Sequence, residues 1–255
     1  RRHVSRHSRT VPTVLVGTSG FSYRDWKPRF YPRDLPASEM LAHYASRLAT
    51  VEINNTFYRR PDKATLAKWA ASVPSSFRFV FKASRYFSGG PGLRDAQKPL
   101  AEFFDLLAAT KEKLGPLLVQ FPEHVKRDLS LLRDFMAAIP SGRRIVLDLR
   151  DPSWRDAAVL EAMREAGVAW CATEADDEPL ELVSTAPWSY VRLRRSRYTA
   201  RDLAAFADRL GQAGVVDGFV ALKHDETGAS AKNAEALQAL LSAPSPISSA
   251  SRRPR

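Results

Sequence analysis

The sequence predicts an α/β fold: a single, closed (β/α)8 barrel of the TIM type. Three observations predict it. Eight short apolar or β-rich runs each end abruptly at a polar or charged residue. Segments with a mostly helical pattern separate these runs, as in a parallel sheet covered by helices. The length of 255 residues suits one such barrel, and no segment indicates a second domain or a solenoid repeat.

The first half of the chain contains four predicted strand–helix pairs. In the third strand, Phe79 and Phe81 occupy every second position, the period of a strand. The glycine-rich residues 89–92 predict a flexible loop or a mobile lid, and Gly115 with Pro116 is expected to end the third helix. Strands are expected at residues 14–16, 50–54, 77–82 and 117–121, and helices at 38–48, 63–72, 98–114 and 129–139.

The second half contains the other four strands. Residues 174–187 are acidic and irregular, so the helix after the sixth strand is expected to be short or missing. The remaining strands are expected at residues 144–149, 168–173, 189–193 and 218–223, with helices at 157–166, 200–210 and 231–241.

The formal charge of +11 first suggests a nucleic-acid partner. Residues 1–10 and 243–255 are Ser/Pro/Arg-rich, hold seven arginines and no acid, and are predicted to be disordered tails. They leave only +4 for residues 11–242, the predicted barrel domain. Weak polyanion binding through the tails is one interpretation, and solvated tails without a partner are the preferred one.

The sequence lacks the features of a membrane or secreted protein. No run reaches the roughly 18–20 apolar residues that span a bilayer, and the N-terminus has no apolar signal segment. The single cysteine, Cys171, excludes an internal disulfide and lies in an apolar strand, which predicts a buried structural thiol. We therefore expect a cytoplasmic protein with no membrane partner.

The polar residues at the strand ends predict the place of the chemistry. In a (β/α)8 barrel the carboxyl ends of the strands form one mouth, where active sites lie. Residues two apart on a strand share a face, so Ile53, Leu147, Leu149 and Leu193 are expected to face the helices. The pairs expected to share the inner face are Glu52 with Asn54, Asp148 with Arg150, and Arg192 with Arg194.

Lys82, Glu52 and Asp148 are the candidate catalytic residues. A lysine that ends a buried strand among other cations can have a lowered pKa and act as a base or form a Schiff base. For Lys82 a structural role, such as a salt bridge to Glu52, is the preferred interpretation, followed by anion binding and then by covalent catalysis. Glu52 and Asp148 together resemble an acid–base pair, although two carboxylates at the mouth of a barrel are a weak signal.

The other candidate residues predict a small anionic ligand, such as a phosphate or carboxylate. For Trp154, which follows Pro152, loop packing is favoured over ligand stacking. The predicted ligand-binding residues are the cations Arg150, Arg192 and Lys223, the hydrogen-bonding residues Thr18, Ser19, Asn54 and Gln120, the aromatic residues Tyr23, Trp26, Tyr58 and Trp154, and His224 at the mouth.

No metal and no cofactor is expected. A multinuclear zinc site needs several histidine and carboxylate ligands, and only His224 falls at a predicted mouth position. Magnesium held by Glu52, Asp148 or Glu174 is an alternative, but pairing of these carboxylates with Lys82 and the arginines is preferred.

Six segments together resemble the YecE-like family, the domain of unknown function numbered seventy-two. The resemblance implies a TIM-type barrel and supplies no established reaction; likeness of the family to endonuclease-type barrels has prompted nucleic-acid proposals. The segments are GTSGFSYRDW (17–26), TVEINNTFYR (50–59), LGPLLVQFP (114–122), RDPSW (150–154), YVR (190–192) and KHDETGASAKNA (223–234).

The chain departs from the family pattern at three histidine or asparagine positions. Where the family usually has Glu-Phe-Arg-His-Pro-Ser-Trp, this chain has Asp151 in place of the histidine. Arg194 stands where the family often has His-Gly, and residues 222–224 read Leu-Lys-His rather than Phe-Asn-Asn or Phe-Lys-His. These changes call a His-dependent step into question.

Three functions remain at this point. The preferred one is a metal-independent enzyme, a hydrolase or lyase, acting on a small anionic substrate at the barrel mouth. The alternatives are a nucleic-acid binding or processing protein and a ligand-binding barrel without catalysis.

Overall fold

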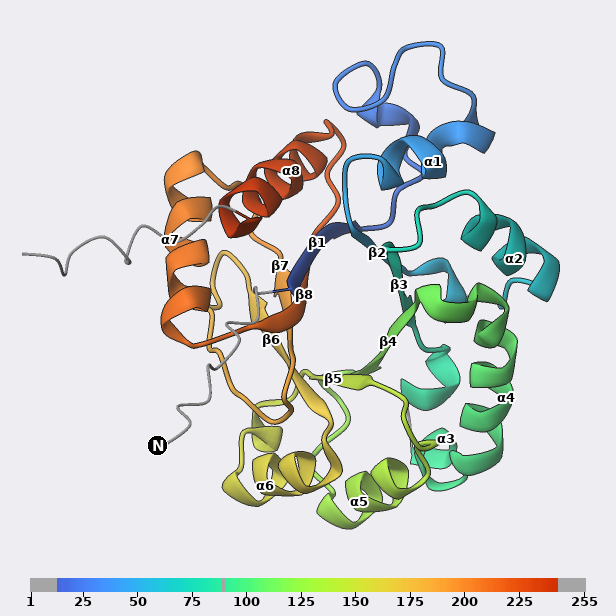
Figure 1. Ribbon diagram of the computed structural model, residues 1–255. Helices are drawn as coiled ribbons and strands as arrows, with labels where there is room; N and C mark the ends of the chain where they lie inside the picture. Colours follow the sequence, from blue (N-terminus) through green and yellow to red (C-terminus); the bar gives the residue numbers. More distant parts are fainter. Residues whose placement is uncertain (1–12, 89, 243–255) are drawn as a thin grey trace, which may run out of the picture.

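The computed structural model describes residues 13–88 and 90–242 and contains a closed barrel of eight parallel strands (Figure 1). Each strand pairs with the next along the chain, and β8 pairs with β1 to close the ring. The strands are β1 (Thr13–Ser19), β2 (Thr50–Ile53), β3 (Arg78–Lys82), β4 (Leu114–Phe121), β5 (Ile145–Leu149), β6 (Ala169–Glu174), β7 (Ser189–Leu193) and β8 (Asp217–Leu222). The predicted fold class is confirmed.

Helices surround the ring of strands, as Figure 1 shows. No helix joins β6 to β7 across residues 175–188, which confirms the irregular sixth connection. The α-helices are α1 (Met40–Ala45), α2 (Lys63–Ala71), α3 (Gly90–Arg94), α4 (Gln97–Leu107), α5 (Leu129–Ala137), α6 (Ala157–Ala166), α7 (Ala200–Gln212) and α8 (Ala229–Ser242). Short 3-10 helices occupy several loops: η1 (Arg24–Trp26), η2 (Ala37–Glu39), η3 (Asn55–Phe57), η4 (Arg85–Ser88), η5 (Ala108–Lys113) and η6 (Pro152–Trp154).

Short polar side chains fix the starts of four helices. Asp62, Asp128 and Asp156 accept hydrogen bonds from backbone N–H groups in the first turns of α2, α5 and α6. Thr199 precedes α7 in a capping box, in which a carboxylate of the first helical turn accepts a hydrogen bond from the Thr199 backbone N–H. Gly167 ends α6 with φ of 65°, a left-handed conformation that glycine adopts at little cost. These caps explain why the predicted and observed starts of α2, α5, α6 and α7 agree.

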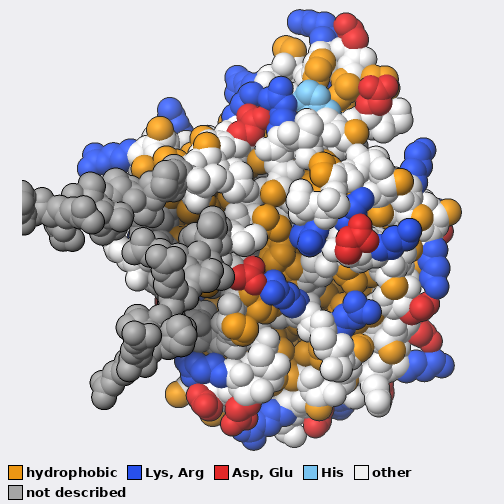
Figure 2. Space-filling model, in the orientation of Figure 1, with side chains coloured by type: hydrophobic (Ala, Val, Ile, Leu, Met, Phe, Trp, Pro, Cys, Tyr) orange, Lys and Arg blue, Asp and Glu red, His pale blue; other side chains and the backbone are white. Residues whose placement is uncertain are grey.

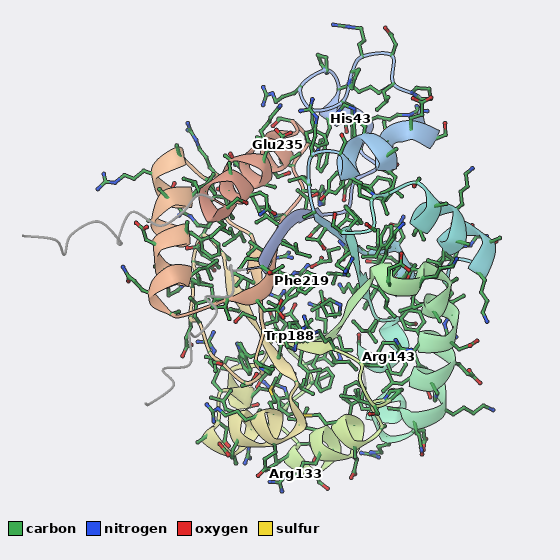
Figure 3. All side chains as sticks on the ribbon, viewed as in Figure 1. His43, Arg133, Arg143, Trp188, Phe219 and Glu235 are labelled. Atoms are coloured by element: carbon green, nitrogen blue, oxygen red, sulfur yellow. The ribbon has the colours of Figure 1, made fainter. Side chains whose placement is uncertain are left out.

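The barrel separates two apolar layers. The larger one lies between strands and helices and includes Ile53, Leu147 and Leu193, as their outward-facing positions predict. The smaller one fills the inside of the barrel and includes Val80, Leu118, Val146, Tyr190 and Phe219. In Figure 3, Phe219 and Trp188 both lie within the ring of strands, and their rings meet edge to face with centroids 6.3 Å apart. Cys171 belongs to this inner layer, which confirms the predicted buried thiol.

Two glycines behave differently from their predicted role. Residues 90–94 form α3 rather than a flexible loop, and a Cβ at Gly92 would lie only 1.8 Å from the Tyr86 carbonyl oxygen. Gly115 lies inside β4 and does not end a helix; the preceding helical segment is divided into α4 and η5. A Cβ at Gly115 would lie 2.7 Å from the Phe79 carbonyl oxygen of β3. Both glycines allow another backbone group to approach closely. The local sequence does not distinguish this role from that of a glycine in a flexible loop or at the end of a helix.

The predicted tails at residues 1–10 and 243–255 lie outside the described residues, so their disorder stays a prediction. Across the described ranges, every helix is too short or too polar to cross a membrane. In the part of Figure 2 not covered by grey atoms, basic and acidic side chains are interspersed and form no continuous patch of one sign.

Candidate functional site

Three charged side chains meet inside the barrel, one layer above the inner apolar core. Glu52 comes from β2, Asp148 from β5 and Arg192 from β7, and each is at most 3 % exposed. Because inward-facing residues recur every second position, Asp148 lies above Val146, and Arg192 lies above Tyr190. The alternation seen in the sequence puts these three predicted residues on the inner face, and closure of the barrel brings them together.

Arg192 bridges the two carboxylates. Its Nη2 donates to Glu52 Oε1 at 2.8 Å, and its Nη1 donates to Asp148 Oδ2 at 3.0 Å. Glu52 also accepts hydrogen bonds from Ser19 Oγ at 2.9 Å and from Tyr190 Oη at 2.8 Å. Both carboxylates are thus paired, as buried charges require, since an unpaired charge in the barrel would be very costly. Arg192 Nε has no hydrogen-bond partner among the described residues.

Arg150 completes the network from the solvent side. Its Nη2 donates to Asp148 Oδ2 at 2.8 Å. Its Nε lies 2.7 Å from Asp148 Oδ1, close enough for an ion pair, although the N–H does not point at that oxygen. The arginine side chain is 21 % exposed, whereas that of Asp148 is 3 % exposed. Two carboxylates and two guanidinium groups together carry no net charge, so the network is electrically balanced.

The balance fixes the protonation state of the buried groups. Burial by itself would raise the pKa of Glu52, but the charge of Arg192 and the bonds from Tyr190 and Ser19 outweigh it and lower that pKa. Burial opposes the charged form of Arg192 too, yet Glu52 and Asp148 raise its pKa above the ordinary value. Glu52 is therefore a fixed anion rather than a proton carrier, and its predicted acid–base role receives no support from this arrangement.

Lys82 ends β3 at the same mouth, half-buried, and stays outside the network. Its Nζ lies 4.3 Å from the centroid of the Phe57 ring. Among the described residues, no carboxylate oxygen lies within 4.0 Å of this nitrogen, and the preferred interpretation, a salt bridge to Glu52, is wrong because Arg192 occupies that carboxylate. Burial, followed by the charge of Arg192, lowers the pKa of Lys82, and Glu52 only partly offsets them.

Two more cations stand at the mouth without a carboxylate. Arg194 follows β7 and is partly buried; burial and the charges of Arg192 and Arg150 lower its pKa. Lys223 follows β8 and is exposed. Neither side chain forms a salt bridge within the ranges that the structure describes. With Lys82, they leave the mouth with positive charge that the internal network does not neutralise.

Aromatic rings cover the β1–β8 side of the mouth. Tyr23 stacks on His224 with ring centroids 4.8 Å apart and an interplanar angle of 8°. Its hydroxyl donates to the Ser19 carbonyl oxygen at 2.9 Å, which ties the loop after β1 to the strand end. Trp26 is fully buried beneath this pair, with its Nε1 donating to the Asp225 carbonyl oxygen at 2.7 Å. Tyr23 and His224 are thus placed to contact a ligand, whereas Trp26 supports the loop.

Not every predicted residue reaches the mouth. Thr18 is fully buried and bonds to Tyr44 of α1, on the helix side of β1. Trp154 is fully buried, and its Nε1 donates to the Val125 carbonyl oxygen at 2.8 Å, which is the packing role that we favoured. Tyr58, by contrast, is 77 % exposed. Asn54 and Gln120 are partly buried: Asn54 lines a cavity of about 450 Å³ with Trp69, and Gln120 lies beside Asp148 in the β4–β5 register.

Sequence reasoning missed three residues of the site as candidates. Tyr190 reaches Glu52, Arg194 adds a surplus cation, and Phe57 contacts the Lys82 amine. Tyr190 and Arg194 share the inner face of β7 with Arg192, so the period of two contained the signal for both. Phe57 lies in a loop helix, and no periodicity in the sequence points to its contact.

Two cavities lie at the strand ends, and the first of them borders the network. One, of about 490 Å³, is lined by Asp148, Arg150 and Thr173 on the β5–β6 side. The other, of about 450 Å³, is lined by Lys223 and His224 on the β7–β8 side. A small molecule in the first cavity would lie against Asp148 and Arg150, and one in the second would lie against Lys223. In the described ranges, no three His, Cys, Asp or Glu side chains are grouped in a way that could hold a metal ion.

Asp151, which replaces the family's histidine, has a local role. It accepts a hydrogen bond from the Ser153 N–H at 3.0 Å, at the start of η6, and it pairs with Lys126. The bonds from Lys126 and Ser153 lower the pKa of Asp151 to about 2. The side chain is thus an ionised capping group rather than a proton donor.

The comparisons with known proteins agree with this architecture. The model of the family described as "Protein of unknown function DUF72" matches residues 15–255, so the chain belongs to that family. A DUF72 family protein from Thermotoga maritima is 22 % identical, with a TM-score of 0.76, over 90 % of this chain and 99 % of that one. One from Enterococcus faecalis is 21 % identical, with a TM-score of 0.73, over 91 % and 97 %. At these identities the likeness shows the fold alone. No curated protein matches the chain.

Proposed function

We propose that this DUF72 family chain is an enzyme that acts on a small substrate carrying a carboxylate or phosphate group, bound at the carboxyl-terminal mouth of the barrel. One observation carries the proposal. The buried carboxylates Glu52 and Asp148 are already neutralised by two arginines, while Lys82 and Arg194 are partly buried cations without a carboxylate. An anionic ligand would supply the missing negative charge in a site of reduced dielectric.

The accessible and the buried residues of the site would have different roles. Arg194 and Lys223 would grip the anionic group, since arginine binds carboxylates and phosphates with two parallel hydrogen bonds. Arg192 and Glu52 are buried and would hold the neighbouring groups in position. Arg150 and Asp148 line the cavity of about 490 Å³, and Lys82 at the end of β3 would be the group that reacts with the substrate. This chemistry uses side chains alone and routes no step through a metal.

Binding can be tested first. In calorimetric titrations of the full chain with phosphate, citrate and pyruvate, Arg194→Met should weaken binding of the accepted anion by about tenfold or more, the scale of one charged hydrogen bond. Arg133→Met is the matched control, because Arg133 is exposed on α5, at the outer edge of the molecule in Figure 3. Equal binding by wild type and Arg194→Met would contradict the proposal.

Turnover is the second test. Panels of phosphate esters, lactones and oxo acids are incubated with the full chain and followed by NMR. Conversion that is lost in Asp148→Asn and Lys82→Met, and retained in Arg133→Met, would support an enzyme. Tight binding without conversion on long incubation would instead leave a ligand-binding barrel without catalysis.

A nucleic-acid partner is the second candidate, and one observation favours it. Tyr58 and Tyr86 are 77 % and 45 % exposed in the loops after β2 and β3, beside the exposed Arg59 and Arg85. Exposed aromatic rings interleaved with arginines suit stacking on single-stranded bases. This candidate predicts binding of a single-stranded oligonucleotide that falls steeply with salt and falls further in Tyr58→Ala. Binding unchanged in Tyr58→Ala and Tyr86→Ala would exclude this surface.

A further inference from the structure

We propose that Lys82 forms a Schiff base with the carbonyl carbon of a small oxo compound whose anionic group lies against the mouth cations. The inference rests on the proposed function and names its chemistry: a 2-oxo acid or an oxo phosphate. It would make Lys82 a covalent catalytic residue rather than an anion-binding one.

The surroundings of the amine are the first argument. Other half-buried lysines in the described ranges use their charge: Lys113 donates to two carbonyl oxygens, and Lys27 donates to the Leu35 carbonyl oxygen. For Lys82 the structure gives only the Phe57 ring, and no oxygen acceptor for its Nζ within the described part of the chain. The Lys82 amine thus forms neither a salt bridge nor a hydrogen bond within the described residues, which leaves its nitrogen free for a substrate.

Hydrogen bonds fix the backbone of Lys82 at the strand end. Thr56 Oγ1 lies 2.6 Å from the Lys82 carbonyl oxygen and 3.0 Å from the Ile53 carbonyl oxygen, and its one hydroxyl hydrogen serves these two acceptors. The Ala83 N–H donates to the Leu118 carbonyl oxygen at 2.8 Å on the other side. Thr56 therefore fixes η3 against the end of β3, and the adjacent Phe57 shields one side of the amine from water. The backbone that carries the amine is therefore fixed, which limits the positions that the nitrogen can reach at the mouth.

The electrostatics favour the reactive form. A lysine attacks a carbonyl only when its amine is neutral, and burial together with Arg192 lowers the pKa of Lys82. The nearby carboxylates oppose this only partly, because Glu52 and Asp148 are bound by arginines. The Phe57 ring attracts the charged form and opposes this lowering in part. The neutral amine is thus more accessible at Lys82 than at an exposed lysine.

The reaction balances without an oxidant or a metal. The nitrogen lone pair of the neutral amine attacks the carbonyl carbon, and the carbonyl electron pair moves to oxygen. A proton passes from nitrogen to that oxygen to give the carbinolamine. The carbon–oxygen bond then breaks, and the hydroxyl leaves as water with one proton taken from solvent. The product is an iminium ion, whose new positive charge would withdraw electrons from neighbouring bonds of the substrate.

Reductive trapping tests the inference. The full chain is incubated with pyruvate, or separately with dihydroxyacetone phosphate, in the presence of cyanoborohydride, and the reduced adduct is located by peptide mass spectrometry. We expect one adduct, at Lys82, and none with lactate or glycerol 3-phosphate, which lack the carbonyl. Lys82→Met should lose the adduct, and Lys98→Met, at an exposed site on α4, should keep it.

Lys82→Arg separates the covalent step from binding. It keeps the positive charge but cannot form a Schiff base, so it should retain anion binding by calorimetry and lose the adduct. Anion binding by wild type without any adduct at Lys82, or adducts spread equally over exposed lysines, would overturn the Schiff base and leave the proposed function standing. Absence of both binding and adduct would overturn the two together.

Discussion

The inside of the barrel has two layers that differ by a single step of two residues along the same strands. On β3, β5 and β7, the lower layer holds Val80, Val146 and Tyr190, and the upper layer holds Lys82, Asp148 and Arg192. The lower layer is held mainly by apolar packing, which has no preferred direction, and its Tyr190 hydroxyl also donates to Glu52 above it. The upper layer is held by ion pairs whose members depend on one another. The barrel thus supplies a rigid apolar floor for a charged site.

The difference also explains where chemistry can occur. Within the upper layer, Glu52 and Arg192 form an ion pair and are buried away from solvent. Lys82 is held by the same strands but has no carboxylate partner. The layer therefore contains an ion-paired part, Glu52 with Arg192, and an unpaired amine, Lys82, to which we assign the proposed reaction.

The largest effect is expected from Arg192→Met. The substitution removes the cation that Glu52 and Asp148 share and leaves both carboxylates buried. The free energy of unfolding should therefore fall by about 3–5 kcal/mol. Urea denaturation measures it. Arg133→Met, on the surface, should change the same quantity by no more than about 0.5 kcal/mol. A loss below about 1 kcal/mol for Arg192→Met would mean that the network is not what holds the upper layer.

A comparable cost is expected from Leu118→Ala in the floor. Leu118 is fully buried, so removing its side chain should lower the free energy of unfolding by about 2–5 kcal/mol through lost burial and a cavity. Because no titratable group is involved, this cost should be the same at pH 7 and pH 4. A cost that changed strongly with pH would show that the two layers are coupled.

The pH dependence separates the layers more sharply. The pKa of Glu52 is lowered in the folded protein, so the unfolded state binds more protons below its own Glu pKa of about 4.3. The stability contributed by Glu52 is therefore complete above that pH and is lost as the pH falls toward the folded pKa. In urea titrations from pH 7 to pH 3, the difference between wild type and Glu52→Gln should narrow on acidification. A constant difference would contradict the assignment.

The smallest effect on stability is expected from Lys82→Met. A lowered folded pKa means that folding works against the charged lysine, so its replacement removes a cost and adds apolar contact. The free energy of unfolding should stay the same or rise by up to about 1 kcal/mol. Reductive trapping should meanwhile be abolished. A loss of more than about 2 kcal/mol would assign Lys82 a structural role instead.

The sequence was sufficient for the fold and for the faces of the strands. Eight runs with polar ends, separated by helical patterns, predict the barrel because a parallel sheet needs helical crossovers. The period of two placed Glu52, Asp148 and Arg192 on the inner face, and Ile53 and Leu193 on the outer face. Both results depend on local periodicity, which a single chain displays directly. Gly115 was misjudged because its role is a close approach to a carbonyl group of the neighbouring strand, and Gly92 because its role is a close approach to the Tyr86 carbonyl group of the preceding turn.

Only the tertiary structure decided which charges meet. Arg192 is 140 residues from Glu52 and 44 from Asp148 along the chain, and their strands come together only when the barrel closes. Glu52 pairs with Arg192 rather than Lys82 because the Arg192 side chain extends across the barrel to the carboxylate. The spacing of residues along one strand carries no information about such a contact. That pairing turned Lys82 from a predicted salt-bridge residue into the unpaired amine of the site. The types of side chain at the mouth came from the sequence, and their pairing came from the closure of the barrel.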